Sequence, residues 1–208
     1  MLFGDTVNKV SVKINDKVLE CVTSFKYLGV FLDTQMDFSL QVDYAALKAK
    51  RATAKVGTLT NGRKGILICI GIDLYKALVR PHLEYAVPVW ASITDKQVDK
   101  LQSVQVQCLK PVVGAKAHSS SAVEVITGIL PFHFCRRELC CREYVRIITQ
   151  DNSQELKQLL HSTVRAGLRF CPLEYIGIVS RQLDRAIAGC QLIKPECLIP
   201  EKCMVTTH

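Results

Sequence analysis

The sequence predicts an α+β fold that is mainly α, with a short antiparallel sheet followed by a helical bundle. Apolar and polar residues alternate near the start, which is typical of strands. Further along, apolar residues recur every three or four positions, which is typical of helices. Hydrophobic residues make up 49% of the 208 residues and charged residues 22%, as in folded chains. We expect a β segment over 1–36, a helical domain over 37–163 and a weakly structured segment over 164–208.

The expected strands are short. Residues 10–14 alternate between apolar and polar side chains, and a turn at 15–17 would return the chain as a partner strand over 18–22. Residues 25–32, which are aromatic and β-branched, predict a third strand. Gly29 falls in its interior, where a glycine often marks a bulge or a close approach of the backbone to another group.

A long helix is expected to begin at Asp37 or Ser39, either of which can cap it, and to end at Asn61-Gly62. One face carries an apolar seam with helical spacing: Val42, Ala45, Ala49, Ala52, Val56 and Leu59. A second stripe on another face is polar and aromatic: Tyr44, Lys48, Arg51 and Lys55.

Further helices follow from the same periodicity and from capping residues. They are expected at 66–80 with a stop at Pro81, at 83–88, from Thr94 or Asp95 to Pro111, at 121–127, at 133–149 and at 154–161. We expect Tyr75, Tyr85 and Trp90 to anchor the helical core, because large aromatic rings bury the most apolar surface.

Positive charge is concentrated in one window. The formal net charge is +8, yet residues 1–43 hold four basic and six acidic side chains, whereas residues 44–72 hold six basic and no acidic ones. A local excess of this kind is the electrostatic footprint expected for nucleic-acid binding. The alternative is a solvated helix face with no ligand.

The residues offer no catalytic centre. Nucleotidyl transfer needs closely placed carboxylates to hold two metal ions, and the chain has no adjacent pair of aspartates. Asp33 and Asp37 come nearest, and capping of a helix explains them more simply. The ten cysteines include no Cys-x-x-Cys pair, so we expect buried thiols and no metal site.

The longest apolar run, 65–72, is too short to cross a bilayer. With no secretory signal pattern at the start, we expect an intracellular protein, cytoplasmic or nuclear, without membrane contact.

Six pieces of this sequence, in order, resemble the segment that follows the catalytic centre in reverse transcriptases of non-LTR (LINE-type) retrotransposons. The pieces are Phe25-Lys26-Tyr27-Leu28-Gly29-Val30, the basic helix 45–59, Leu74–Tyr85, Pro88-Val89-Trp90, the Leu101, Val104, Gln105 and Gly114 pattern, and Leu130-Pro131 with Arg136-Arg137. The resemblance covers about residues 1–150. Departures are Phe38 where the family commonly has Trp, Gln41 where it commonly has His, and Pro111 within a stretch that the family keeps helical.

The resemblance implies that 1–36 is the end of a polymerase palm and 37–163 a thumb-like bundle. It implies primer positioning by Lys26, Tyr27 and Gly29. It also implies nucleic-acid contacts from the second stripe of the long helix, with Tyr44 stacking and Lys48, Arg51 and Lys55 following phosphates. Arginines 136, 137, 142 and 146 either extend this surface or pair with Glu138 and Glu143.

We therefore expect a fragment or truncated derivative of a LINE-type RNA-directed DNA polymerase that positions an RNA or DNA primer–template. The family's metal-binding aspartates, which use Mg²⁺, lie outside the chain, so we expect no enzymatic activity and no cofactor here. The remaining parts of a reverse transcriptase are a further expected partner. The alternative is a helical protein-interaction module with no role in nucleic-acid binding.

Overall fold

The computed structural model describes residues 13–15, 17–18, 20, 22–60, 67–114, 119–150, 154–166, 175–178 and 181–182. Two short hairpins precede a set of packed helices, which confirms the predicted mainly α, α+β fold class. The strands are β1 (Lys13–Ile14), β2 (Lys17–Val18), β3 (Ser24–Tyr27) and β4 (Val30–Asp33). The helices are α1 (Ser39–Thr60), α2 (Ile68–Leu74), the π-helix η1 (Tyr75–Val79), α3 (Arg80–Glu84), α4 (Val87–Trp90), α5 (Asp95–Val112), α6 (Ser120–Thr127), α7 (Phe132–Thr149) and α8 (Gln154–Ala166).

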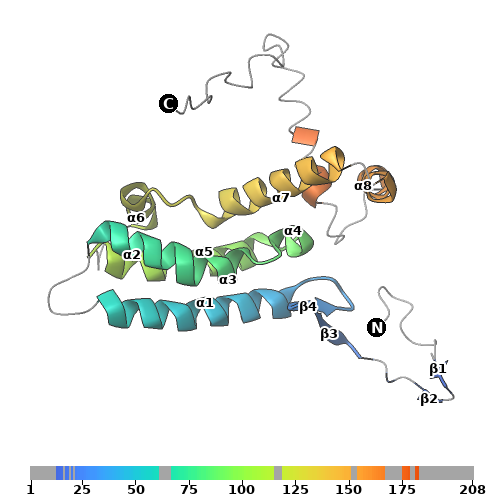
Figure 1. Ribbon diagram of the computed structural model, residues 1–208, viewed down its shortest axis with the longest axis horizontal. Helices are drawn as coiled ribbons and strands as arrows, with labels where there is room; N and C mark the ends of the chain where they lie inside the picture. Colours follow the sequence, from blue (N-terminus) through green and yellow to red (C-terminus); the bar gives the residue numbers. More distant parts are fainter. Residues whose placement is uncertain are drawn as a thin grey trace, which may run out of the picture.

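The helix α5 lies at the centre of the bundle, between α1 on one side and α6 and α7 on the other (Figure 1). One apolar cluster runs through these helices, from Val30 on β4 to Ile176. The β3–β4 hairpin lies against the N-terminal part of α1, so the end of the sheet and the basic helix face each other.

The expected third strand over 25–32 is a hairpin. β3 and β4 pair antiparallel, with Tyr27 opposite Val30. Leu28 and Gly29 form the turn between them, with φ of 46° and 86°. A two-residue turn that matches the twist of its strands requires positive φ at both central positions, which glycine adopts without strain. Gly29 is thus the second turn residue and not the interior of a strand. The earlier hairpin exists as predicted, with Lys13 opposite Val18. Its second strand is Lys17–Val18, so Lys17 belongs to the strand and not to the turn, and the expected strand does not extend to residues 20 and 22.

Two aspartates fix the start of α1. The Asp33 carboxylate accepts hydrogen bonds from the backbone N–H groups of Asp37 at 3.1 Å and Phe38 at 3.0 Å. Asp37 Oδ1 accepts one from the N–H of Ser39 at 2.7 Å. Orphan amides at a helix start are satisfied in this way. Asp37 therefore satisfies the first amide of α1, whereas Asp33 binds the amides of the two residues that precede the helix.

The apolar seam of α1 is buried as predicted from Val42 to Val56. For Leu59 the prediction is wrong, because its side chain is 53% exposed near the end of the helix. Phe38 is fully buried just before α1, and Gln41 is buried with its Oε1 accepting the N–H of Phe31 at 3.0 Å. These two of the three departures from the family pattern therefore lie in the packing between the hairpin and α1.

Pro81 does not stop the second helix, contrary to expectation. The chain stays helical from Ile68 to Glu84, with η1 inserted before the proline. In η1 the N–H of Arg80 bonds to the carbonyl of Tyr75, five residues back. This wider turn starts a new register, so Pro81 falls in the first turn of α3, where a missing N–H is tolerated.

The short helix expected at 83–88 is also displaced. Ala86 has φ of 53°, which ends α3 and starts α4 at Val87. The helix α5 runs one residue beyond Pro111, which lies in the last turn of the helix. Few backbone hydrogen bonds follow that position, so the proline disrupts little of the helix. The helices α6 and α7 match the prediction within a residue, and α8 continues to Ala166, past the expected end at 161.

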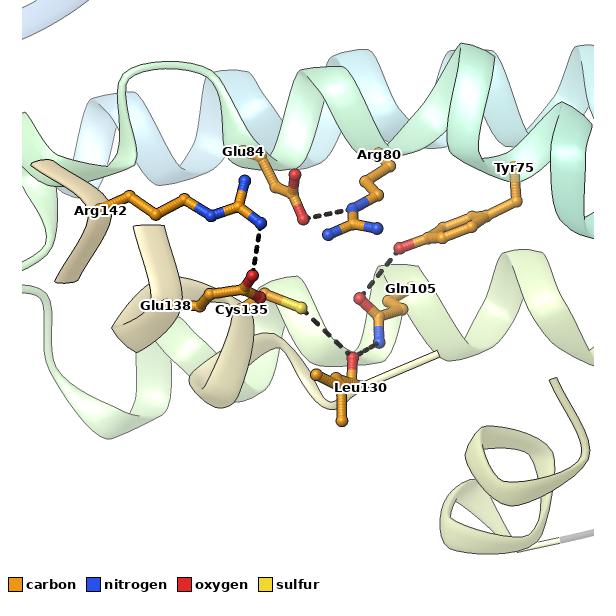
Figure 2. A network of polar contacts seen from close by, with 8 residues as sticks. All are labelled: Tyr75, Arg80, Glu84, Gln105, Leu130, Cys135, Glu138 and Arg142. Carbon is orange, nitrogen blue, oxygen red and sulfur yellow. Dashed lines mark hydrogen bonds and ion pairs between the residues drawn. The ribbon is translucent and has the colours of Figure 1, made fainter. Parts of the chain in front are cut away.

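Two of the three expected aromatic anchors are buried. Trp90 and Tyr75 are at most 1% exposed, whereas Tyr85 is 53% exposed and is not a core residue. Tyr75 Oη donates to Gln105 Oε1 at 3.0 Å, and Gln105 Nε2 donates to the carbonyl of Leu130 at 2.9 Å (Figure 2). This chain of hydrogen bonds satisfies the buried hydroxyl and amide and joins η1, α5 and the entry to α7.

Candidate nucleic-acid interface

A groove of about 340 Å³ lies between the β3–β4 turn, the first half of α1 and the start of α3. It is lined by Lys26, Gly29, Gln41, Tyr44, Ala45, Lys48, Pro81, His82 and Tyr85. The groove brings together Lys26 and Gly29, expected to position a primer, with Tyr44 and Lys48, expected to contact nucleic acid. These two groups are distant in the sequence and meet because the hairpin packs on α1.

Tyr44 holds the groove's two lysines. Lys26 Nζ donates to Tyr44 Oη at 2.9 Å and lies 4.4 Å from the centre of the tyrosine ring. Lys48 Nζ lies 4.6 Å from the same ring centre. The ring of Phe31 contacts Tyr44 edge-on, with 5.1 Å between centroids. Cation–π attraction and a hydrogen bond thus hold the ammonium groups of Lys26 and Lys48 beside Tyr44 in the lining of the groove.

The electrostatics of Tyr44 follow from these contacts. The hydrogen bond from Lys26, and then the one from Lys48, lower the pKa of the Tyr44 hydroxyl below its usual value near 10, because both cations favour the phenolate. Both ammonium groups remain at the surface, and none of the residues lining the groove is a carboxylate. The groove is therefore cationic.

Gly29 makes its close approach to a tyrosine. A Cβ at position 29 would lie 3.3 Å from Tyr85 Cε1, and Tyr85 Oη donates to the carbonyl of Leu28 at 2.7 Å. Trp90 Nε1 donates to the carbonyl of Tyr85 at 2.9 Å, which ties the tyrosine to the core. Tyr85 is a site residue that the helical pattern missed. The only signal for it in the sequence is its place in the Leu74–Tyr85 motif.

The remaining expected contact residues lie outside the groove. Tyr27 is 59% exposed on β3. Arg51 and Lys55 are exposed and continue the line of Lys48 along α1. Within the described part of the chain, no ion pair includes Lys48, Arg51 or Lys55. Lys48, Arg51 and Lys55 thus form a row of cations that leads from the groove along α1 and has no acidic partner in the described part of the chain.

The arginines of α7 are arranged differently. Arg142 pairs with Glu138 at 2.6 Å, and Arg146 Nε with Glu143 at 2.9 Å. Arg136 is buried and donates to the backbone carbonyls of Ala91 and Ile93 at 3.0 and 3.3 Å. The pairing alternative therefore holds for Arg142 and Arg146, and burial removes Arg136 from any basic surface. Arg137 is exposed and takes part in no ion pair among the described residues.

The thiols are mostly as expected. Cys108, Cys135 and Cys140 are buried, whereas Cys69 is exposed, contrary to the expectation of buried cysteines. Burial raises the pKa of the Cys140 thiol to about 12, so it stays protonated at neutral pH. Among the residues that the structure describes, no three His, Cys, Asp or Glu side chains gather as metal ligands would. Nor does any helix in that part of the chain combine the length and apolar character needed to cross a membrane.

Comparison with known proteins confirms the resemblance to non-LTR reverse transcriptases. The chain is 27% identical over 104 residues to the RNA-directed DNA polymerase from mobile element jockey of Drosophila funebris, a match that covers 50% of this chain and 11% of that protein. It is 25% identical over 91 residues to a probable RNA-directed DNA polymerase from transposon X-element of Drosophila melanogaster, covering 44% of this chain and 10% of that protein.

A third relative is the retrovirus-related Pol polyprotein from type-1 retrotransposable element R1 3 of Nasonia vitripennis. It is 25% identical over 138 residues, which cover 62% of this chain and 36% of the polyprotein. The chain thus spans about a tenth of the length of the first two relatives. No protein-family model and no solved structure matches it.

Proposed function

We propose that this chain grips primer–template nucleic acid in the manner of a reverse transcriptase thumb and does not itself join nucleotides. The observation that carries the proposal is the row of exposed cations on α1, which continues into the groove under the β3–β4 turn. The similarity to RNA-directed DNA polymerases of mobile elements gives this row a ligand class.

The geometry of α1 suits a nucleic-acid backbone. From Tyr44 to Lys55 the helix rises about 16 Å, at 1.5 Å per residue. That length is about the axial distance covered by five phosphates of one strand of a duplex. Lys48, Arg51 and Lys55 would contact phosphates without reading bases, so binding should be salt-dependent and indifferent to sequence. Lys26, Tyr27 and Gly29 would meet the strand where it passes the hairpin.

The chemistry of nucleotide addition would come from elsewhere. The carboxylates of Asp33 and Asp37 accept backbone hydrogen bonds at and just before the start of α1, and two metal ions need carboxylates that are free to bind them. We propose that other parts of a reverse transcriptase supply the palm with its catalytic carboxylates, and that this chain binds the primer–template.

A charge-reversal variant tests the grip. K48E/R51E/K55E should lose most of its affinity for a fluorescent primer–template at low salt, because three attractive phosphate contacts become repulsions. The matched control K50E/K96E/K157E changes the net charge equally, on Lys50 away from the stripe and on two lysines of α5 and α8, and should bind within about threefold of wild type. The slope of log K against log salt should become shallower by about 0.7–0.9 for each phosphate that the variant no longer neutralises.

A second assay tests the absence of catalysis. Incubation of the chain with primer–template, nucleotides and Mg²⁺ should give no extension, and extension would overturn that part of the proposal. Absence of salt-sensitive binding in the wild type, or equal binding by both triple variants, would favour a protein-interaction module instead.

A further inference from the structure

We propose that the groove takes one unpaired nucleotide, with its base against the Tyr85 ring and its phosphate between Lys26 and Lys48. This inference rests on the proposed function for its ligand class and goes beyond it in two respects. It names a discrete binding site for a single nucleotide, and it assigns the stacking role to Tyr85 and not to Tyr44.

The size and lining of the groove suit such a ligand. Its volume of about 340 Å³ lies at the lower end of the range for small-molecule sites. Ala45, Pro81 and the ring of Tyr85 contribute apolar surface to its lining, whereas Lys26 and Lys48 supply positive charge. A nucleotide matches these two properties, because it joins a flat aromatic base to an anionic phosphate.

Tyr85 is the aromatic ring prepared for stacking. Its side chain is 53% exposed, yet both ends of the residue are fixed, Oη by the carbonyl of Leu28 and the main-chain carbonyl by Trp90 Nε1. Gly29 leaves room for the ring to lie directly against the turn. A rigid exposed ring loses little conformational entropy when a base stacks on it.

Tyr44 is less suited to that role and better suited to holding the phosphate ligands. Two ammonium groups lie within 4.6 Å of its ring centre, and Phe31 contacts it edge-on. A base would have to displace a lysine to stack there. The same contacts place Lys26 and Lys48 so that their remaining N–H donors can bind one anionic group between them.

The ligand must be unpaired. Within a duplex each base is stacked on both faces by its neighbours and cannot reach a protein ring. A template overhang, a frayed primer end or a free single strand presents such a base. The groove therefore gives the chain a preference for single-stranded or junction substrates over blunt duplex, which the α1 stripe alone would not provide.

The test compares a labelled single-stranded 10-mer with a blunt duplex of the same sequence. Y85A should bind the single strand about 5- to 160-fold more weakly, the range found when a stacking aromatic is removed, and should bind the duplex within twofold of wild type. Y85F keeps the ring but loses the hydrogen bond to the Leu28 carbonyl, so it should bind the single strand more tightly than Y85A and the duplex within twofold of wild type. An equal loss for both ligands in Y85A, or no loss for either, overturns the inference.

A measurement on the wild-type chain avoids any folding defect of the variants. Adenosine monophosphate should shift the Tyr85 ring resonances in an NMR titration, and inorganic phosphate at the same ionic strength should not. Equal shifts from both would make the groove an anion site only and would overturn the inference. Failure of the proposed function has a different signature, which is absence of wild-type duplex binding whatever the nucleotide does.

Discussion

The helices α1 and α7 are both long and both rich in basic residues, but they use their positive charge in opposite ways. On α1, Lys48, Arg51 and Lys55 are exposed, and none of them takes part in an ion pair among the described residues. On α7, Arg142 and Arg146 are paired with glutamates of the same helix and Arg136 is buried, which leaves Arg137 exposed and without an ion pair among the described residues. A count of basic residues would rank the two helices alike. The two helices differ in whether acidic side chains lie beside the exposed cations and in whether an arginine is buried.

The buried arginine should give the largest stability effect. R136A would leave the carbonyls of Ala91 and Ile93 without their donor and would also remove the cation that lies 4.4 Å from the Tyr175 ring. Unfolding in urea, followed by the fluorescence of the single tryptophan, Trp90, should show a loss of about 3 kcal/mol. Binding of primer–template by the folded variant should stay unchanged. If the folded R136A variant instead bound primer–template more weakly than wild type, α7 would contribute to the interface.

The turn beside the groove is the next most sensitive point. G29A places a Cβ at φ of 86° and within 3.3 Å of Tyr85, so the hairpin should lose about 1–2 kcal/mol. Backbone amides of β4 should exchange with deuterium about tenfold faster, while those of α7 keep their wild-type rates. Unchanged exchange in β4 would show that the turn does not hold the groove together.

Surface pairs on α7 should contribute little. R142A removes an exposed i, i+4 pair with Glu138 and should lower stability by about 0.5 kcal/mol. In 1 M salt the difference from wild type should vanish, because screening weakens exposed pairs. A loss as large as that of R136A would contradict the distinction drawn between buried and exposed arginines.

Tyr44 should show the smallest effect on stability and a clear effect on titration. Its folded pKa is lowered by Lys26 and Lys48, so its contribution is fully present only above the unfolded pKa near 10 and is lost as the pH falls through the folded pKa. The stability at neutral pH should therefore not depend on this shift in the pKa of Tyr44. In an absorbance titration the ionisation of Tyr44, below the usual tyrosine pKa, should disappear in Y44F and move to higher pH in K26Q. Tyr75, whose pKa is raised by burial, should ionise at a higher pH than Tyr44.

Local patterns predict the helices well and the joints between them poorly. The seam from Val42 to Val56 follows from helical periodicity, since one face must meet the core. Leu59 breaks the rule because burial depends on what packs opposite, and no pattern within α1 encodes that. Proline normally ends a helix, which predicts a stop at Pro81. The π-helix η1 before it places the proline in the first turn of α3 instead, where it is tolerated.

The candidate site can be predicted only in part, because its contacts join distant segments. The basic stripe is visible from the spacing of Lys48, Arg51 and Lys55 within one helix. The groove depends on Lys26 meeting Tyr44 across 18 residues and on Tyr85 meeting Leu28 across 57. Such pairings are set by the packing of the hairpin on α1 and α3. The resemblance to reverse transcriptases indicates the segments that meet, and the structure supplies the contacts.

The most direct test of the contrast between α1 and α7 compares R51Q/K55Q with R142Q/R146Q. Each double variant removes two exposed positive charges, so their net charges are equal. The affinity for primer–template, measured by fluorescence anisotropy between about 50 and 200 mM salt, should give a slope of log K against log salt that is smaller by about 1.5 in R51Q/K55Q. The slope for R142Q/R146Q should equal that of the wild type. Equal reductions in both variants, or a larger one for α7, would contradict the account.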